Sequence, residues 1–191
     1  MSFRRYRALD LCIFTALLCI GETLIVFLCA HGFSDQPFTL SLTPAVTAVV
    51  MVRWGAFAAI PAAAGAAALC MASGAQALQY AVYGAGNLLA LALIPALRRI
   101  TWKQLHEHVL LAMLYGLLCA LLMQMGRAAA ALITGAAPAV CAGFITTDVL
   151  SSLFSVLVVW ICRRLDGMLE EQRHYLKRIR EEMIRAGGIH A

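Results

Sequence analysis

The sequence predicts an all-α integral membrane protein, on three observations. Of its 191 residues, 62% are hydrophobic and only 13% are charged, and the mean hydropathy is +0.83. A soluble domain of this length is far less apolar. The apolar residues also form runs long enough to cross about 30 Å of hydrocarbon as helices, and the basic residues lie mainly between these runs.

Six apolar runs predict six transmembrane helices. The first, Leu9 to Ala30, has 22 residues, which is too long for the apolar part of a cleaved signal peptide, so we expect it to be retained. The second, Leu40 to Val52, would cover only about 20 Å as a helix. We expect it to enter the protein partly extended and to turn helical at Pro44, with Ser41 or Thr43 as the cap. The remaining runs are 56–72, 77–97, 109–125 and 140–161.

The lysines and arginines predict the orientation of the chain. If the N-terminus is cytoplasmic, all of the 15 Lys and Arg residues except Arg127 lie in cytoplasmic segments, and both termini are inside. Arg53 then marks a cytoplasmic hairpin between the second and third spans, with Trp54 at the interface and Gly55 permitting the turn. One long span through this stretch would bury Arg53 near the membrane centre, at about 2.5 to 3.5 kcal/mol or more.

Polar residues follow one helix face in each of the last three spans, in the half predicted to be outer. The first span adds Glu22 in the same half. An ionisable residue within a span is costly without a partner and is therefore a functional hypothesis. We expect these faces to line an outward-facing cavity for a small polar solute, with Arg127 favouring an anionic group on it. The candidate site residues are Glu22, Gln79, Tyr80, Tyr83, Asn87, Gln124, Arg127, Thr147, Asp148 and Ser151.

Structural interpretations of the same charges remain open. Arg127 can extend to the lipid headgroups. Glu22 and Asp148 can instead form structural pairs with Arg127 or with amides of the fourth span. Asp10 is interpreted most simply as a charge at a helix start, where the dipole favours it.

Enzymatic and metal-binding functions have little support. Seven cysteines are scattered through apolar segments without the spacing of a metal site or a disulfide framework. No HExxH, GxSxG or P-loop sequence is present. A membrane-embedded enzyme would need Glu22 or Asp148 as a general acid or base. We therefore expect no catalytic residue, no cofactor, no metal and no nucleic-acid partner.

The C-terminal segment is basic and amphipathic. We expect it to continue the helix of the last span, loosened at Gly167. It would lie on an anionic membrane surface or dock on a partner subunit. The chain is thus divided into a six-helix solute-binding domain, 1–164, and a cytoplasmic tail, 165–191.

Several local sequences together resemble one membrane protein family. They are the small residues Ala8, Cys12 and Ala16 on the first span, FTLSLTPAV before the second, RWG at the hairpin and YGAGN in the fourth. With six short spans, the sequence resembles the substrate-binding S components of energy-coupling factor (ECF) vitamin transporters.

The resemblance implies a bacterial cell-membrane protein that binds a vitamin or other micronutrient and has no ATPase activity of its own. It implies partners as well, namely a transmembrane coupling subunit, contacted by Ala8, Cys12 and Ala16, and two ATP-binding subunits. The loop from Gly32 to Leu42 would be a lid over the cavity. The alternative is the rod-shape membrane protein family called MreD, whose members have a similar size and act as scaffolds without a solute.

Overall fold

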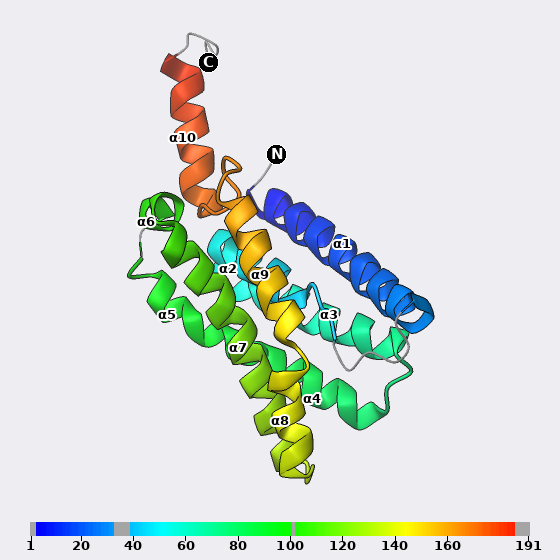
Figure 1. Ribbon diagram of the computed structural model, residues 1–191. Helices are drawn as coiled ribbons and strands as arrows, with labels where there is room; N and C mark the ends of the chain where they lie inside the picture. The colour runs from blue at the N-terminus through cyan, green and yellow to red at the C-terminus, as the bar shows by residue number, and fades with distance from the viewer. Residues whose placement is uncertain (1–2, 33–38, 101, 186–191) are drawn as a thin grey trace.

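Figure 1 shows a computed structural model that describes residues 3–32, 39–100 and 102–185. These residues form helices and turns and contain no strand, so the all-α prediction is confirmed for them. Their five helical runs that are long and apolar enough to cross a membrane indicate a membrane protein. The runs are 3–32, 43–72, 77–97, 109–133 and 138–162. Residues 33–38 of the predicted lid and 186–191 of the predicted tail lie outside the described residues.

The first helix, α1 (Phe3–Gly32), packs mainly against α3 (Ala59–Ala72). Only Leu11, Leu18 and Glu22 of α1 are buried. One face of the helix therefore stays open to lipid or to another protein. This face carries large apolar side chains that are each more than half exposed, namely Leu9, Ile13, Leu17, Ile20 and Leu24.

The helical run 43–72 reverses direction in the middle, as the hairpin prediction requires. It consists of α2 (Thr43–Trp54), the 3-10 turn η1 (Gly55–Ala58) and α3. Gly55 has φ 59°, a backbone conformation that favours glycine. Thr43, at the start of α2, lies against Gly65 in α3, where an added Cβ would be only 2.3 Å from Thr43 Oγ1. The two limbs are therefore antiparallel.

The run 77–97 consists of α4 (Ala77–Asn87), the 3-10 segment η2 (Leu88–Leu93) and α5 (Ile94–Leu97). After the short α6 (Trp102–Glu107), α7 (Val109–Ile133) packs against α2, α4, α8 and α9. The backbones of α4 and α7 touch at two glycines. A Cβ at Gly126 would lie 2.1 Å from Gly86 O, so this close approach depends on the absence of both side chains.

The last run is broken at Thr147 and Asp148, between α8 (Pro138–Thr146) and α9 (Val149–Cys162). The main apolar core lies where α2, α7 and α9 meet. It includes Ala48, Val50, Met51, Ala112, Cys119, Met123 and Val159, all almost fully buried.

The prediction that the tail continues the last span as one helix is wrong. The helix α9 ends at Cys162, the chain turns at Gly167 with φ 70°, and α10 (Gln172–Arg185) begins as a separate helix that projects from the bundle (Figure 1). The turn is held by the bundle, because Arg53 Nη1 donates a hydrogen bond of 2.8 Å to Gly167 O and Tyr6 Oη donates to Gln172 Oε1 at 3.1 Å.

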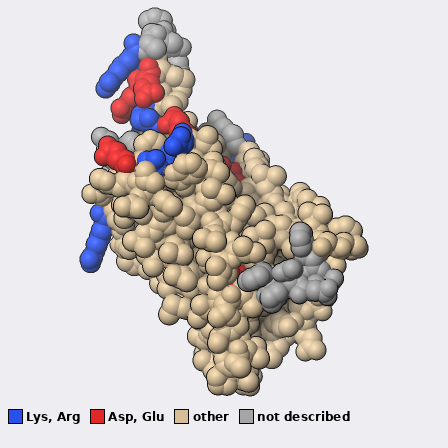
Figure 2. All heavy atoms as spheres, viewed as in Figure 1, with Lys and Arg blue, Asp and Glu red and all other residues tan. Residues whose placement is uncertain are grey.

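Charged side chains are unevenly distributed over the molecule. On the face shown in Figure 2, the Lys and Arg side chains gather over α10 and the adjoining end of the bundle. We call this the basic end, defined by Arg7, Arg53, Arg98 and Arg173 around one pocket. At this end Asp10 lies well inside α1, which begins at Phe3, so its interpretation as a charge at a helix start is wrong. It pairs with Arg53 instead, at 2.9 Å.

Candidate functional site

A buried ion pair joins α7 to the break before α9. Arg127 Nη1 lies 2.9 Å from Asp148 Oδ2, and both side chains are only 4% exposed. Arg127 Nε also donates to Asn87 Oδ1 at 2.7 Å, and its guanidinium carbon lies 4.9 Å from the centre of the Tyr83 ring. The interpretation of Arg127 as extending to the lipid headgroups is therefore wrong. The pairing of Asp148 with Arg127 is present, because a charge buried this deeply requires a partner.

Asp148 is bound from several elements because the helix is interrupted there. Its Oδ1 accepts hydrogen bonds from Thr39 Oγ1 at 2.8 Å and from Ser151 Oγ at 2.5 Å. Its main-chain oxygen accepts one from Gln124 Nε2 at 3.0 Å, and the same amide nitrogen donates to Ser152 Oγ at 2.8 Å. Together with the ion pair to Arg127, these contacts engage both carboxylate oxygens and the main-chain oxygen of Asp148. They stabilise the break between α8 and α9.

Glu22 closes the other side of this region and binds the start of α2. Its Oε1 accepts hydrogen bonds from Ser41 Oγ at 2.6 Å, Thr43 N at 2.8 Å and Thr43 Oγ1 at 2.6 Å. A carboxylate at a helix N-terminus interacts favourably with the dipole and with the unpaired N–H groups of the first turn. The predicted cap is corrected accordingly. The N-cap residue is Leu42, and the acidic acceptor comes from α1.

Residues 39–42, which we call the strap, connect these two centres. Ser41 N donates to Ser151 Oγ at 2.9 Å, and Thr39 N donates to Thr147 O at 3.1 Å. One hydrogen-bonded network therefore runs from Glu22 through the strap and Asp148 to Arg127 and Asn87. Asn87 Nδ2 completes it by donating to the main-chain oxygen of Ala62 in α3 at 3.1 Å.

A small pocket of about 320 Å³ opens beside the ion pair. Its polar part comes from Arg127, Asp148, Thr39 and Thr147, and its apolar part from Val140, Gly143, Phe144 and Tyr83. The Tyr83 and Phe144 rings meet edge to face, with centres 5.7 Å apart. A concave site with aromatic walls and a few charged groups is suited to a small polar molecule with an anionic or hydrogen-bonding group.

The structure brings together most of the predicted site residues. Those in the network or the small pocket are Glu22, Tyr83, Asn87, Gln124, Arg127, Thr147, Asp148 and Ser151. Two lie outside it. Gln79 is exposed in the first turn of α4, where its side chain accepts a hydrogen bond from Gln76 N at 2.9 Å. Tyr80, the next residue, is not part of the network and does not line the small pocket.

The predicted site did not include Thr39 and Ser41 of the strap or the adjoining Thr43, whose hydroxyl groups belong to the network. Thr39, Ser41 and Thr43 alternate with leucines immediately before a buried helix. This alternation points every second side chain in one direction in an extended segment, and it could have identified them.

The remaining predicted features are simpler. Ala8, Cys12 and Ala16 are all exposed on α1, so they are accessible to another protein or to lipid. Among the described residues, no three His, Cys, Asp or Glu side chains are grouped so that they could hold a metal ion. No protein-family model, curated protein or solved structure matches the chain. Its function is therefore inferred from the chemistry of the site.

Proposed function

We propose that this protein is the membrane-embedded substrate-binding subunit of an ECF-type importer, which binds a vitamin or related micronutrient from outside the cell. It would deliver the solute together with a transmembrane coupling subunit and two ATP-binding subunits. The observation that carries the proposal is the small pocket beside Arg127 and Asp148, bordered by the strap. A site made of a few fixed polar groups and two aromatic rings, within an apolar bundle, suits selective binding of one small solute.

We place the chain in the bacterial cell membrane with six spans and both termini in the cytoplasm. The six spans are α1, α2, α3 with η1, α4 to α5, α7, and α8 with α9. The reversal at Gly55 supports separate second and third spans. The gathering of arginines at the basic end supports that end as cytoplasmic. The small pocket then faces outward.

The strap gives the site a means of opening. Thr39 and Ser41 of the strap are joined to Asp148, Ser151 and Glu22 by hydrogen bonds. A solute with its own polar groups can replace such contacts at little net cost, because a hydrogen bond exchanged for another contributes little to the free energy. Binding and closure of the strap would then occur together, as in other sites covered by a loop.

The test is a thermal-unfolding screen of the detergent-solubilised protein against vitamins and their precursors. A ligand at 100 times its dissociation constant stabilises the folded state by about 2.7 kcal/mol. We expect one compound to raise the unfolding temperature. A screen without any stabilising compound, and without a co-purifying small molecule, would contradict the proposal.

Gly143→Leu is a sharp variant for this screen. Gly143 lines the small pocket, and a Cβ added there meets no atom within 4 Å, so the larger side chain fills the pocket without a clash at its base. We expect it to abolish ligand stabilisation while leaving the unliganded protein folded. Gly84→Leu is the matched control, since a Cβ there also meets nothing within 4 Å and Gly84 does not line the pocket.

The alternative is an MreD-like scaffold that binds no solute. It is favoured by the fact that Arg127 and Asp148 satisfy each other, so their burial needs no ligand. A scaffold would retain its cellular function in the Gly143→Leu variant, whereas an importer subunit would lose uptake. The two proposals therefore predict opposite results for one substitution.

A further inference from the structure

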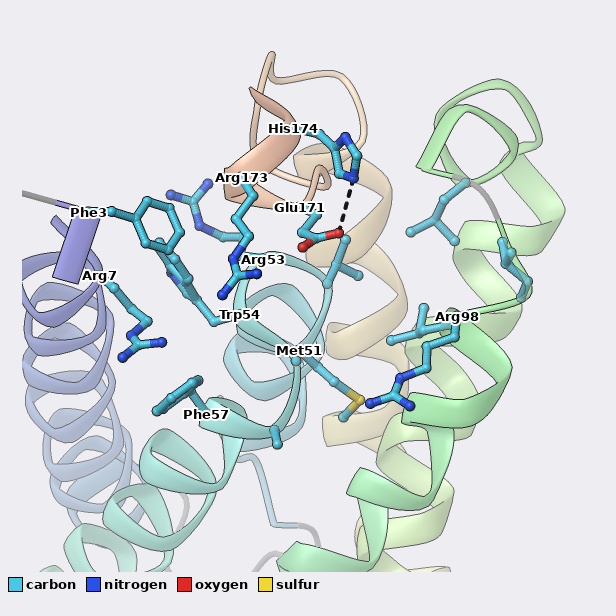
Figure 3. Close-up of a pocket in the computed structure, with 16 residues that line it drawn as sticks. Phe3, Arg7, Met51, Arg53, Trp54, Phe57, Arg98, Glu171, Arg173 and His174 are labelled. Atoms are coloured by element: carbon cyan, nitrogen blue, oxygen red, sulfur yellow. Dashed lines mark ion pairs between the residues drawn. The ribbon is translucent and has the colours of Figure 1, made fainter. Parts of the chain in front are cut away.

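A larger pocket of about 570 Å³ lies at the basic end, away from the polar network. It is enclosed by the N-terminal turns of α1, the α2–η1 turn, the segments around α5 and α6, and the start of α10. Figure 3 shows that arginines reach it from several of these elements. Its charged lining consists of Arg7, Arg53, Arg98, Arg173, His174 and Glu171. We call it the arginine pocket.

The positive charge of the arginine pocket is only partly neutralised. Arg53 is bound by Asp10, with Nε and Nη2 each donating to the carboxylate at 2.9 to 3.0 Å. Glu171 lies 3.5 Å from His174. Within the described residues no ion pair is formed by Arg7, Arg98 or Arg173. Three cations around one hollow create a positive potential that attracts anions.

Two of these guanidinium groups are oriented by aromatic rings. The Arg7 guanidinium carbon lies 3.9 Å from the centre of the Phe57 ring, and that of Arg173 lies 5.5 Å from the centre of the Phe3 ring. Stacking on a ring face fixes a guanidinium in place without neutralising it or consuming its N–H donors. Both groups thus keep the donors that bind a phosphate.

An exposed apolar surface adjoins this positive pocket. Phe57 lines the pocket and is 41% exposed, and Ile60, three residues further along the chain, is 48% exposed. A soluble anion needs no such surface, whereas a lipid requires a basic site for its headgroup and an apolar surface beside it for its acyl chains. Basic pockets between transmembrane helices bind anionic headgroups in this way.

We propose that the arginine pocket binds an anionic phospholipid, with Arg7, Arg98 and Arg173 holding the phosphate-bearing headgroup and the apolar surface around Phe57 contacting the acyl chains. The proposal depends on the bundle lying in a bilayer and does not depend on the solute or on the coupling partners. The lipid would link α1, the α2–η1 turn and α10, which are distant in the sequence. It would therefore stabilise the contact of the C-terminal segment with the bundle.

The experiment compares lipid binding by native mass spectrometry and thermal unfolding of the delipidated full chain. The probes are phosphatidylglycerol, phosphatidylcholine with the same acyl chains, and inorganic phosphate. The pocket variant combines Arg7→Gln, Arg98→Gln and Arg173→Gln. A basic residue near an anionic headgroup favours binding by about fivefold, so we expect a loss on the order of 100-fold for the three together.

Two control variants keep the result interpretable. The first combines Lys177→Gln, Arg180→Gln and Arg185→Gln, exposed positions of α10 outside the pocket that remove the same charge. We expect it to bind phosphatidylglycerol as the parent protein does. The second replaces the three pocket arginines by lysine, which keeps the charge and should retain most of the binding. If the glutamine variant does not fold, Arg98→Gln alone serves, because Arg98 is exposed.

Several outcomes would overturn the proposal. Equal loss in the pocket variant and the α10 control would show a general effect of net charge. Equal binding of phosphatidylcholine and phosphatidylglycerol would show that headgroup charge plays no part. Displacement of the lipid by inorganic phosphate, or equal stabilisation by phosphate alone, would assign the pocket to a soluble anion. Lipid retained by the pocket variant, with loss of a co-purifying subunit, would assign the pocket to a protein partner.

Discussion

The contact between α4 and α7 gives the sharpest test of how the site is positioned. A methyl group at Gly86 would lie 2.5 Å from Arg127 N and 2.8 Å from the carbonyl carbon of Gly126. Carbon atoms in ordinary contact are about 3.5 to 4.0 Å apart, so the helices would have to separate by about 1 Å in Gly86→Ala. Overpacking of this kind costs about 1 to 3 kcal/mol or more. The movement would also strain the 2.7 Å hydrogen bond between Arg127 Nε and Asn87 Oδ1.

Gly84→Ala is the matched control on the same helix. A Cβ at Gly84 meets no atom within 4 Å, so the substitution should only remove the helix penalty of glycine, a gain of about 1 kcal/mol. Thermal unfolding in detergent should therefore place Gly86→Ala below the parent protein and Gly84→Ala at or above it. A change of 1 kcal/mol shifts the unfolding temperature by about 2 to 4 °C in a chain of this size. Equal unfolding temperatures for the two variants would refute the proposed contact.

Three further predictions concern the polar contacts. Asp148→Asn should destabilise the protein by about 3 to 5 kcal/mol in thermal unfolding, because Arg127 stays buried without a carboxylate. The double change Arg127→Gln and Asp148→Asn removes both charges and keeps polar groups opposite Asn87, Thr39 and Ser151, so it should recover part of this loss; a double variant no better than the single one would contradict the role of the ion pair. Glu22→Gln should lower the free energy of unfolding by about 1 to 2 kcal/mol, because the N-terminus of α2 loses its negative partner. Amide hydrogen exchange at the start of α2 should become faster, and unchanged exchange there would count against this role of Glu22. Tyr6→Phe removes the hydrogen bond to Gln172 and should weaken the contact between the C-terminal segment and the bundle by about 1 kcal/mol. Limited proteolysis should then cleave the C-terminal segment faster, and an unaltered cleavage rate would argue against the contact.

The sequence predicts those features that depend on local composition and helical period. Helical apolar runs follow from hydropathy, and the reversal at Gly55 follows from a charge and a glycine placed between two such runs. The polar faces that hold Asn87 and Arg127 follow from helical spacing. The same spacing wrongly adds Gln79 to the candidate site. Helical periodicity indicates the face of α4 on which a side chain lies, but it does not show that the first turn of α4 is exposed.

Features that depend on contacts between distant segments are not predictable from one sequence. Asp10 carries no local signal for its pairing with Arg53, which lies on another helix. Gly167 permits the turn, and a hydrogen bond from Arg53 stabilises it. The helical pattern of the tail alone indicates a helix that is loosened at Gly167 and continues beyond it. The strap likewise acquires its role only when α1 and α9 lie on either side of it.

The polar contacts of α1 explain how the short α2 acquires a defined position among apolar neighbours. Apolar packing alone is nearly as favourable after a small shift along the helix, whereas a buried charge has one satisfactory position. Asp10 and Glu22 are separated by about 18 Å along α1, at about 1.5 Å per residue, and they bind Arg53 and Thr43, which are about 15 Å apart along α2. The two acids therefore hold both ends of α2. A shift of α2 by one turn would break both contacts at once and would also displace the strap from Asp148, so the position of the candidate site depends on the same two charges.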